Sequence, residues 1–187
     1  ENYCVDTDGR MFFTVTRDGR PLRKRRYMYS ESFFVMGMAE YAFATGDRDA
    51  LNKAEICFER MLQIYHNPTS DPYFVTPKSF AATRAERTLA LPMVLVSCAQ
   101  VLRRCDAEKA AYYTNIAGSV IGDIIKYHVK NEWHCVLENV LLDGTYIDNP
   151  AGRTINPGHS IENAWFMMCQ AVYTNDKELL DICLNIL

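Results

Sequence analysis

Residues 152–165, with the sequence GRTINPGHSIENAW, hold the side chains best suited to acid–base chemistry. The Asn-Pro-Gly turn predicts a helix start, with Asn156 as the N-cap and Pro157 at the first helical position, where proline is favoured. His159 then lies near the positive end of the helix dipole, which favours the neutral imidazole that a general base requires. Glu162 follows on the same helical face and could accept a hydrogen bond from the ring. The alternative interpretation is a packed histidine beside a surface glutamate.

Other kinds of centre find less support in the sequence. A His-x-x-Glu pair can serve a di-iron site, but such a site needs a second pair on a facing helix, and the sequence holds none. The other histidines, His66, His128 and His134, lie at predicted helix ends or at a strand start, where capping or packing explains them. Zinc-ligand spacings, a Walker loop and a G-x-S-x-G elbow are also absent from the sequence. We therefore expect no metal.

Further charged residues could contribute to a site or to the scaffold. Glu138 lies in the strand pattern Val-Leu-Glu-Asn-Val, so its carboxylate points either into a cavity or outward. Arg26 and Glu31 could form a structural ion pair at the entry to a helix. The basic run over residues 23–26 could form a phosphate or nucleic-acid patch, but a solvated turn with one structural arginine is favoured. The net charge of −3 gives no reason to expect nucleic acid.

Helical periodicity dominates the chain that must position these residues. We expect helices over residues 30–45, 49–65, 86–103, 107–129, 157–173 and 177–187, the fourth shortened where Gly118 or Gly122 interrupts it. An Asp-Gly turn predicts a β-hairpin over residues 11–22, and residues 136–142 show a second short strand pattern. Similar acidic joints link the helices into three successive hairpins, the pattern of a solenoid or of a closed α/α toroid.

Composition places the chain among globular proteins with a real core. Its 187 residues are 49% hydrophobic, which suits one domain or part of a larger one. The seven cysteines are odd in number and include no CxxC pair, which favours a reducing cytosol. The longest apolar run, residues 89–102, is interrupted and shorter than the roughly 20 residues that span a bilayer. Because the chain starts without Met and ends in an apolar helix, we expect further sequence or a partner beyond it.

Three blocks, over residues 26–40, 136–140 and 152–166, carry a resemblance to a known family. They are similar in order and spacing to the N-acylglucosamine 2-epimerase family, which includes the renin-binding proteins. The resemblance implies an all-α (α/α)6 barrel with short β-hairpins in its loops. It also implies that residues 1–187 form a single domain covering the central half of that barrel, with its N- and C-terminal parts missing.

The resemblance implies an isomerase that interconverts N-acetylglucosamine and N-acetylmannosamine. A base removes the C2 proton of the ring-opened sugar, and an acid returns a proton to the opposite face. His159 matches one catalytic histidine and Glu162 its neighbouring acid, while Glu138, Arg153 and Arg26 are assigned to substrate binding. The segment that carries the second catalytic histidine is absent from these residues.

Other readings of the resemblance stay open. Cys135 stands where cellobiose 2-epimerases carry a histidine, which favours the branch acting on acylated monosaccharides. The alternatives are cellobiose 2-epimerase, an aldose–ketose isomerase or glycoside-processing enzyme on the same fold, and a helical binding scaffold without catalysis. The resemblance further implies a cytoplasmic homodimer with no required cofactor, with ATP as an optional allosteric activator and without nucleic-acid or membrane partners.

Overall fold

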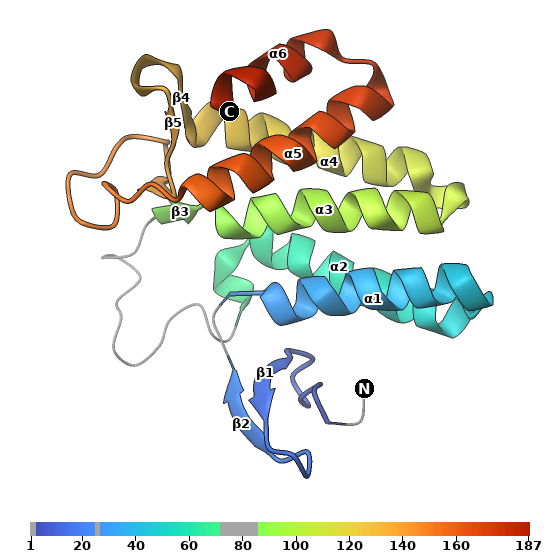
Figure 1. Cartoon of the computed structure of the whole chain (residues 1–187). Helices are drawn as coiled ribbons and strands as arrows, with labels where there is room; N and C mark the ends of the chain where they lie inside the picture. The colour runs from blue at the N-terminus through green and yellow to red at the C-terminus, as the bar shows by residue number, and fades with distance from the viewer. Residues whose placement is uncertain (1–2, 25–26, 72–85) are drawn as a thin grey trace. The chain divides into compact units, whose positions relative to one another are not determined.

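The computed structural model of the chain describes residues 3–24, 27–71 and 86–187 (Figure 1). The backbone forms two compact units, residues 1–79 and 80–187, and each is described by itself. Across the described residues there are six α-helices and six short strands. No helix in these ranges is both long enough and apolar enough to cross a bilayer.

The first unit consists of a β-hairpin followed by a helical hairpin. Its elements are β1 (Phe12–Val15), β2 (Pro21–Lys24), α1 (Tyr29–Thr45) and α2 (Arg48–His66). β1 and β2 pair antiparallel across a turn in which Gly19 takes a φ of 84°, a value that glycine adopts without strain. The predicted β-hairpin is confirmed, with Thr16 and Arg20 closing the turn by a backbone hydrogen bond of 2.8 Å.

The sharp joint between α1 and α2 comes from the acidic turn seen in the sequence. Gly46 ends α1 in the left-handed conformation, with a φ of 77°. The Asp47 carboxylate then caps α2 by accepting hydrogen bonds from the amides of Asp49 and Ala50. The small buried Ala39 of α1 lets the two helices pack closely, so the first predicted helical hairpin is confirmed.

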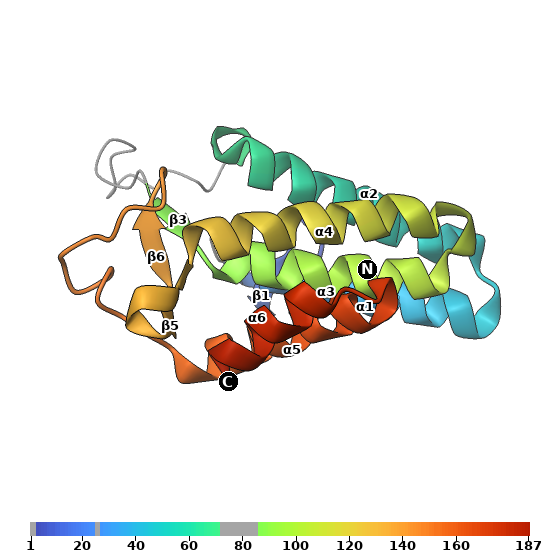
Figure 2. The same cartoon turned by 90° about the horizontal axis from the view of Figure 1, so that it is seen from above.

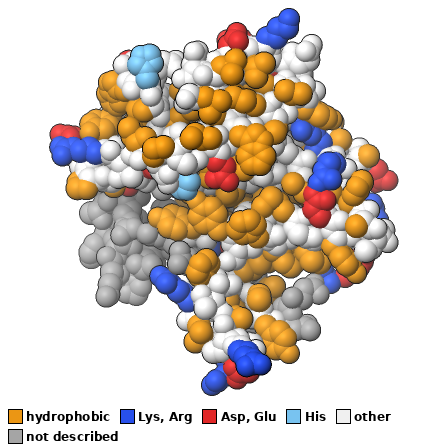
Figure 3. Space-filling view, viewed as in Figure 1, with side chains coloured by type: hydrophobic (Ala, Val, Ile, Leu, Met, Phe, Trp, Pro, Cys, Tyr) orange, Lys and Arg blue, Asp and Glu red, His pale blue; other side chains and the backbone are white. Residues whose placement is uncertain are grey.

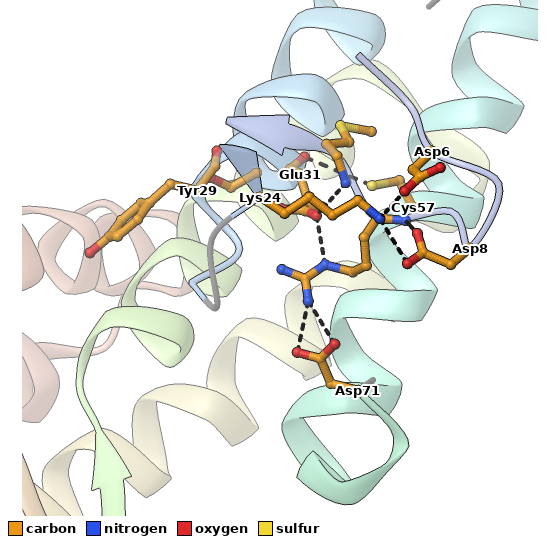
Figure 4. A network of polar contacts seen from close by, with 10 residues as sticks. Asp6, Asp8, Lys24, Tyr29, Glu31, Cys57 and Asp71 are labelled. Atoms are coloured by element: carbon orange, nitrogen blue, oxygen red, sulfur yellow. Dashed lines mark hydrogen bonds and ion pairs between the residues drawn. The ribbon is translucent and has the colours of Figure 1, made fainter. Parts of the chain in front are cut away.

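A buried ionic network ties the start of the chain to this hairpin (Figure 4). Arg10 is only 1% exposed; its Nε donates to Oε1 of Glu31 at 2.7 Å, and a terminal nitrogen donates to both carboxylate oxygens of Asp71 at 2.7 Å. Burial lowers the pKa of Arg10, but the bonds and charges of Glu31 and Asp71 outweigh it and hold that pKa above its usual value. The predicted partner of Glu31, Arg26, lies outside the described residues.

The second unit contains the other four helices and four short strands. Its elements are β3 (Glu86–Thr88), α3 (Ala90–Cys105), α4 (Ala110–Tyr127), β4 (Val129–Lys130), β5 (Cys135–Val136), β6 (Asn139–Leu141), α5 (Pro157–Thr174) and α6 (Lys177–Ile186). Figures 1 and 2 show α3, α4 and α5 lying side by side, with the strands gathered at the end where α5 begins. The pairs α3–α4 and α5–α6 form the second and third predicted helical hairpins, and α3 also packs against α5.

The core of this unit lies between the helices. It is built from apolar side chains on the facing sides of α3, α4 and α5 that are at most 3% exposed: Met93, Leu95, Val96, Leu102, Tyr113, Ala117, Ile121, Ile124, Ala164, Met167 and Ala171. Burial of this apolar surface is the main force that holds the hairpins together.

Two predicted boundaries in this unit are wrong for identifiable reasons. Residues 86–88 form β3 rather than the first turn of a helix, because they pair antiparallel with β6, a strand about fifty residues later in the chain. The strand pattern over residues 136–142 is split into β5 and β6, which pair with different partners. Gly118 and Gly122 lie on the exposed side of α4 and do not shorten it, because helix hydrogen bonds need no side chain.

Candidate functional site

The start of α5 has the predicted geometry. Asn156 is the N-cap, and its Oδ1 accepts a hydrogen bond of 3.3 Å from the His159 amide. Pro157 occupies the first helical position, so His159 lies in the first turn. Ala164 and Met167 are fully buried further along the helix and hold it against the core. The position of His159 is therefore set by a helix that is anchored on one side.

The His159 ring is paired with a carboxylate from outside its own helix. Its Nδ1 lies 2.9 Å from Oε1 of Glu138, and the two side chains are 31% and 13% exposed. An ionised carboxylate can only accept, so Nδ1 carries the hydrogen. In the neutral ring the lone pair then sits on Nε2, at the end of the ring that faces away from Glu138.

The hydrogen bond expected from Glu162 is instead made by Glu138. A helical side chain leans toward the N-terminus of its helix, so the His159 ring reaches back past the first turn. Glu162 lies one turn further along α5, and it is exposed to solvent. The acceptor therefore comes from the strand segment beside the helix start.

Glu138 is held by the backbone on both sides. It lies between β5 and β6, where the Leu137 amide donates to the His128 carbonyl at 2.9 Å. The Glu138 carbonyl accepts a hydrogen bond of 2.9 Å from the amide of Leu89, just before α3. Leu137 is 2% exposed and Leu89 is fully buried, so the backbone of Glu138 is anchored in the core while its carboxylate reaches His159.

The loop before α5 is fixed to the same strand segment. Asn139 donates its side-chain amide to the Ala151 carbonyl at 3.1 Å. Gly152 approaches the backbone of Ile147 so closely that a Cβ atom there would overlap it. This contact requires glycine, and it explains why the block that leads to Asn156 begins with that residue.

Among the other predicted site residues, Arg153 has a different described partner. Arg153 is exposed, and its Nε donates to Oδ1 of Asp148 at 2.8 Å. This hydrogen bond is the main cause of a raised Arg153 pKa. Arg26 falls outside the described residues. Along α5, Ile161 and Trp165 are more than half exposed, and hydrophobic side chains are visible over this helix in Figure 3.

Two buried cysteines, Cys57 and Cys183, have thiols that are poor nucleophiles. Burial raises the pKa of Cys57 to about 12 and that of Cys183 to about 11, so both thiols stay protonated at neutral pH. Residues 3–24, 27–71 and 86–187 hold no group of three His, Cys, Asp or Glu side chains arranged to bind a metal ion.

His128 is a second histidine close to Glu138, and it is buried. Only 3% of it is exposed, and its Nδ1 lies 2.8 Å from the carbonyl oxygen of Leu137. Desolvation lowers its pKa from 6.5 to about 4. At neutral pH the ring is therefore uncharged, and Nδ1 must carry the hydrogen that the carbonyl accepts.

This buried histidine predicts a loss of stability in acid. Between pH 6.5 and about 4 the unfolded chain protonates His128 while the folded chain does not. Stability from this residue is therefore complete above pH 6.5 and falls by about 3 kcal/mol as the pH drops toward 4. Urea unfolding at several pH values should show this slope in the wild type, and His128→Asn should flatten it. An unchanged slope in that variant contradicts the assignment.

Sequence reasoning missed the contact that organises the site. His159 and Glu138 are 21 residues apart and belong to different elements, so no periodicity links them. The signals for Glu138 are its place inside an apolar strand pattern, which leaves the direction of its carboxylate open, and the family resemblance, which does not pair it with His159. The role of the His128 ring was likewise hidden, because a histidine at a helix end has a simpler explanation as a cap.

Comparisons with known proteins agree on one family. A sequence model of the N-acylglucosamine 2-epimerase (GlcNAc 2-epimerase) family matches residues 1–183. The N-acylglucosamine 2-epimerase of Bos taurus is 34% identical over 167 residues, which cover 89% of this chain and 39% of the bovine protein. A cellobiose 2-epimerase of Eubacterium cellulosolvens is 23% identical, and the match covers 97% of this chain and 50% of that protein.

A solved structure has the same fold. The cellobiose 2-epimerase of Bacillus thermoamylovorans superposes with a TM-score of 0.79 at 16% identity, covering 98% of this chain and 50% of that one. The predicted all-α class and α/α-barrel fold are confirmed by this likeness. The chain spans half or less of the length of the relatives it matches.

Proposed function

Because this chain belongs to the N-acylglucosamine 2-epimerase family, we propose that the protein is a sugar 2-epimerase acting by proton transfer at C2. The proposed substrates are N-acetylglucosamine and N-acetylmannosamine, since the relatives at 34% identity carry the N-acylglucosamine name. The observation that carries the proposal is the 2.9 Å contact between His159 Nδ1 and Glu138 Oε1 at the start of α5.

This contact suits a general base. With the hydrogen on Nδ1 engaged by Glu138, Nε2 of His159 presents a lone pair that can remove the C2 proton of the ring-opened sugar. The Glu138 carboxylate then stabilises the imidazolium that forms, as a carboxylate does in other histidine dyads. The electrons left on C2 delocalise onto the C1 carbonyl oxygen, and a proton returned to the opposite face of C2 completes the inversion.

The other groups of the site are proposed from the family resemblance and from their position. A second acid on the opposite face of the sugar belongs to the part of the relatives' length that these 187 residues do not span. Glu162 and Arg153 are exposed, which leaves them accessible to the hydroxyl and acyl groups of a sugar. Arg26 is proposed as a substrate contact on the resemblance alone.

The test is isotope exchange by the full-length protein. N-acetylmannosamine is incubated in D2O, and the C2 proton is followed by NMR. Loss of that signal with formation of N-acetylglucosamine supports the proposal. A ketose product favours the aldose–ketose isomerase, and exchange only with cellobiose favours the cellobiose branch. If none of these sugars exchanges or reacts, the helical binding scaffold becomes the better reading.

The two acidic neighbours of His159 should differ in importance. Glu138→Gln replaces the acceptor of the Nδ1 hydrogen by an amide, so we expect the kcat for epimerisation to fall by about tenfold to a hundredfold. Glu162→Gln, at an exposed position one turn away, should lower kcat by less than the Glu138 change does. Steady-state kinetics on both variants measure the difference. If kcat falls further in Glu162→Gln than in Glu138→Gln, then Glu162 is the functional partner of the His159 ring.

The cellular setting is also a proposal. We infer a cytoplasmic location from the odd number of cysteines without a CxxC pair, and a homodimer from the family resemblance only. No cofactor is required in this proposal, and ATP acts only as an allosteric activator. Sedimentation of the full-length protein and epimerase assays with and without ATP test these points.

A further inference from the structure

We propose that His128 is a positioning residue that sets the direction of the Glu138 side chain through the peptide plane between Leu137 and Glu138. The inference rests on the proposed function, in which Glu138 orients His159. In the described hydrogen bonds, the His128 side chain contacts the Leu137 carbonyl and the His159 ring contacts Glu138, so His128 would act on His159 only through Glu138.

The first step is a reciprocal contact at the end of α4. The His128 amide closes the last turn of the helix by donating to Ile124, and its carbonyl accepts from the Leu137 amide at 2.9 Å. Its side chain returns toward the same residue, and Nδ1 lies 2.8 Å from the Leu137 carbonyl oxygen. His128 therefore holds Leu137 by both its amide and its carbonyl.

The second step follows from the planarity of the peptide bond. The carbonyl of Leu137 and the amide of Glu138 share one rigid plane, so the hydrogen bond from His128 orients the backbone that enters Glu138. The plane that leaves Glu138 is held by the 2.9 Å bond between its carbonyl and the Leu89 amide. With both planes pinned, the two backbone torsions of Glu138 are determined.

The third step concerns the alternatives for the Leu137 carbonyl. Leu137 is 2% exposed and His128 is 3% exposed, so water has little access to this carbonyl. A buried carbonyl that loses its donor moves to find another. That movement would rotate the peptide plane and carry the Glu138 carboxylate away from His159.

The charged groups around His128 do not replace this contact. Lys130, Arg87 and Asp123 lie near enough to act on it electrostatically, and their effects on its pKa are smaller than that of burial. Lys130 donates to the Gly144 carbonyl at 2.9 Å, and Arg87 donates to the Leu142 carbonyl at 2.6 Å. Among the described side chains, Nδ1 of His128 is therefore the donor to the Leu137 carbonyl oxygen.

The test compares two substitutions in the full-length protein. In His128→Asn the amide nitrogen takes the place of Nδ1, because both atoms are bonded to Cγ, and kcat should stay within about threefold of wild type. In His128→Leu the donor is lost, and kcat should fall by about tenfold to a hundredfold while KM changes little. His66→Leu is the matched control, because His66 is an exposed histidine at the end of α2.

A spectroscopic readout separates positioning from a loss of fold. In nitrogen-15 NMR of labelled histidine, the wild-type His159 ring should show the Nδ1–H form that Glu138 selects. In His128→Leu the ring should move toward the Nε2–H form that free imidazole prefers, and His128→Asn should restore the wild-type spectrum. Should His128→Leu lack helical circular dichroism, His128→Phe replaces it, since its ring fills a similar space without a hydrogen-bond donor.

The outcomes are distinct. A folded His128→Leu or His128→Phe variant with unchanged kcat and an unchanged His159 spectrum overturns the inference. A wild-type protein that exchanges no sugar proton defeats the proposed function, but the shift of the His159 spectrum still decides whether His128 positions Glu138. Loss of activity with a wild-type His159 spectrum also counts against the inference, because it assigns His128 a different role.

Discussion

Replacing His159 by alanine in the full-length protein is expected to slow C2 proton exchange by about a hundredfold to ten-thousandfold, the usual contribution of a positioned acid–base group. The variant loses the Nε2 lone pair and also leaves Glu138 without its 2.9 Å partner. The fold should survive, because His159 is 31% exposed and α5 keeps its Asn156 cap and its buried face. Initial rates of deuterium incorporation into N-acetylmannosamine measure the effect.

The control for this change is His66→Ala, which removes an exposed histidine from α2. Its exchange rate should equal that of wild type, and circular dichroism should show native helix content in both variants. Exchange near the wild-type rate in a folded His159→Ala protein would place the base elsewhere. A raised KM with unchanged kcat would mean that His159 binds the sugar without taking its proton.

Replacing Arg10 by methionine should give the largest loss of stability. The change removes the Arg10 cation from the buried carboxylates of Glu31 and Asp71, and breaking a buried ion pair in this way costs about 3–5 kcal/mol. The free energy of unfolding of a domain is only about 5–15 kcal/mol, so this loss would remove a large fraction of it. Urea unfolding followed by helix circular dichroism should show the midpoint falling at constant slope.

Two further variants define the cause of this loss. Arg20→Ala breaks an ion pair with Asp18 in which both side chains are more than 60% exposed, and it should leave the urea midpoint unchanged. Combining Arg10→Met with Glu31→Gln and Asp71→Asn removes the uncompensated charges, so part of the lost stability should return. A single Arg10→Met variant as stable as wild type would show that the network in Figure 4 contributes little.

The helical framework followed from local sequence patterns. The cap at Asn156, the Gly46-Asp47 joint and the apolar spacing of α5 act within a few residues, so they could be located without tertiary contacts. The start of α3 could not be located in this way. Residues 86–88 have no strong local preference, and their pairing with β6 decides their conformation.

The candidate site also combines features that local sequence predicts with one contact that depends on the tertiary fold. Turn and helix chemistry placed His159 in the first turn of α5, and the family resemblance marked Glu138 as a residue near the pocket. The two side chains meet because the tertiary structure brings the segment between β5 and β6, which carries Glu138, to the start of α5. Glu162 was expected to fill this place because it is a helical neighbour, and the lean of the His159 side chain toward the helix start prevents it.

Most of the helical segments, the place of His159 in the first turn of its helix and the family of the chain can be predicted from the sequence alone. These properties depend on hydrogen bonds and apolar spacing within one or two helical turns, together with recognisable blocks of residues. Three contacts became visible only in the folded chain: Glu138 with His159, His128 with the Leu137 carbonyl, and Arg10 with Glu31 and Asp71. These contacts join residues 9 to 61 positions apart, and burial of the surrounding apolar surface brings them together.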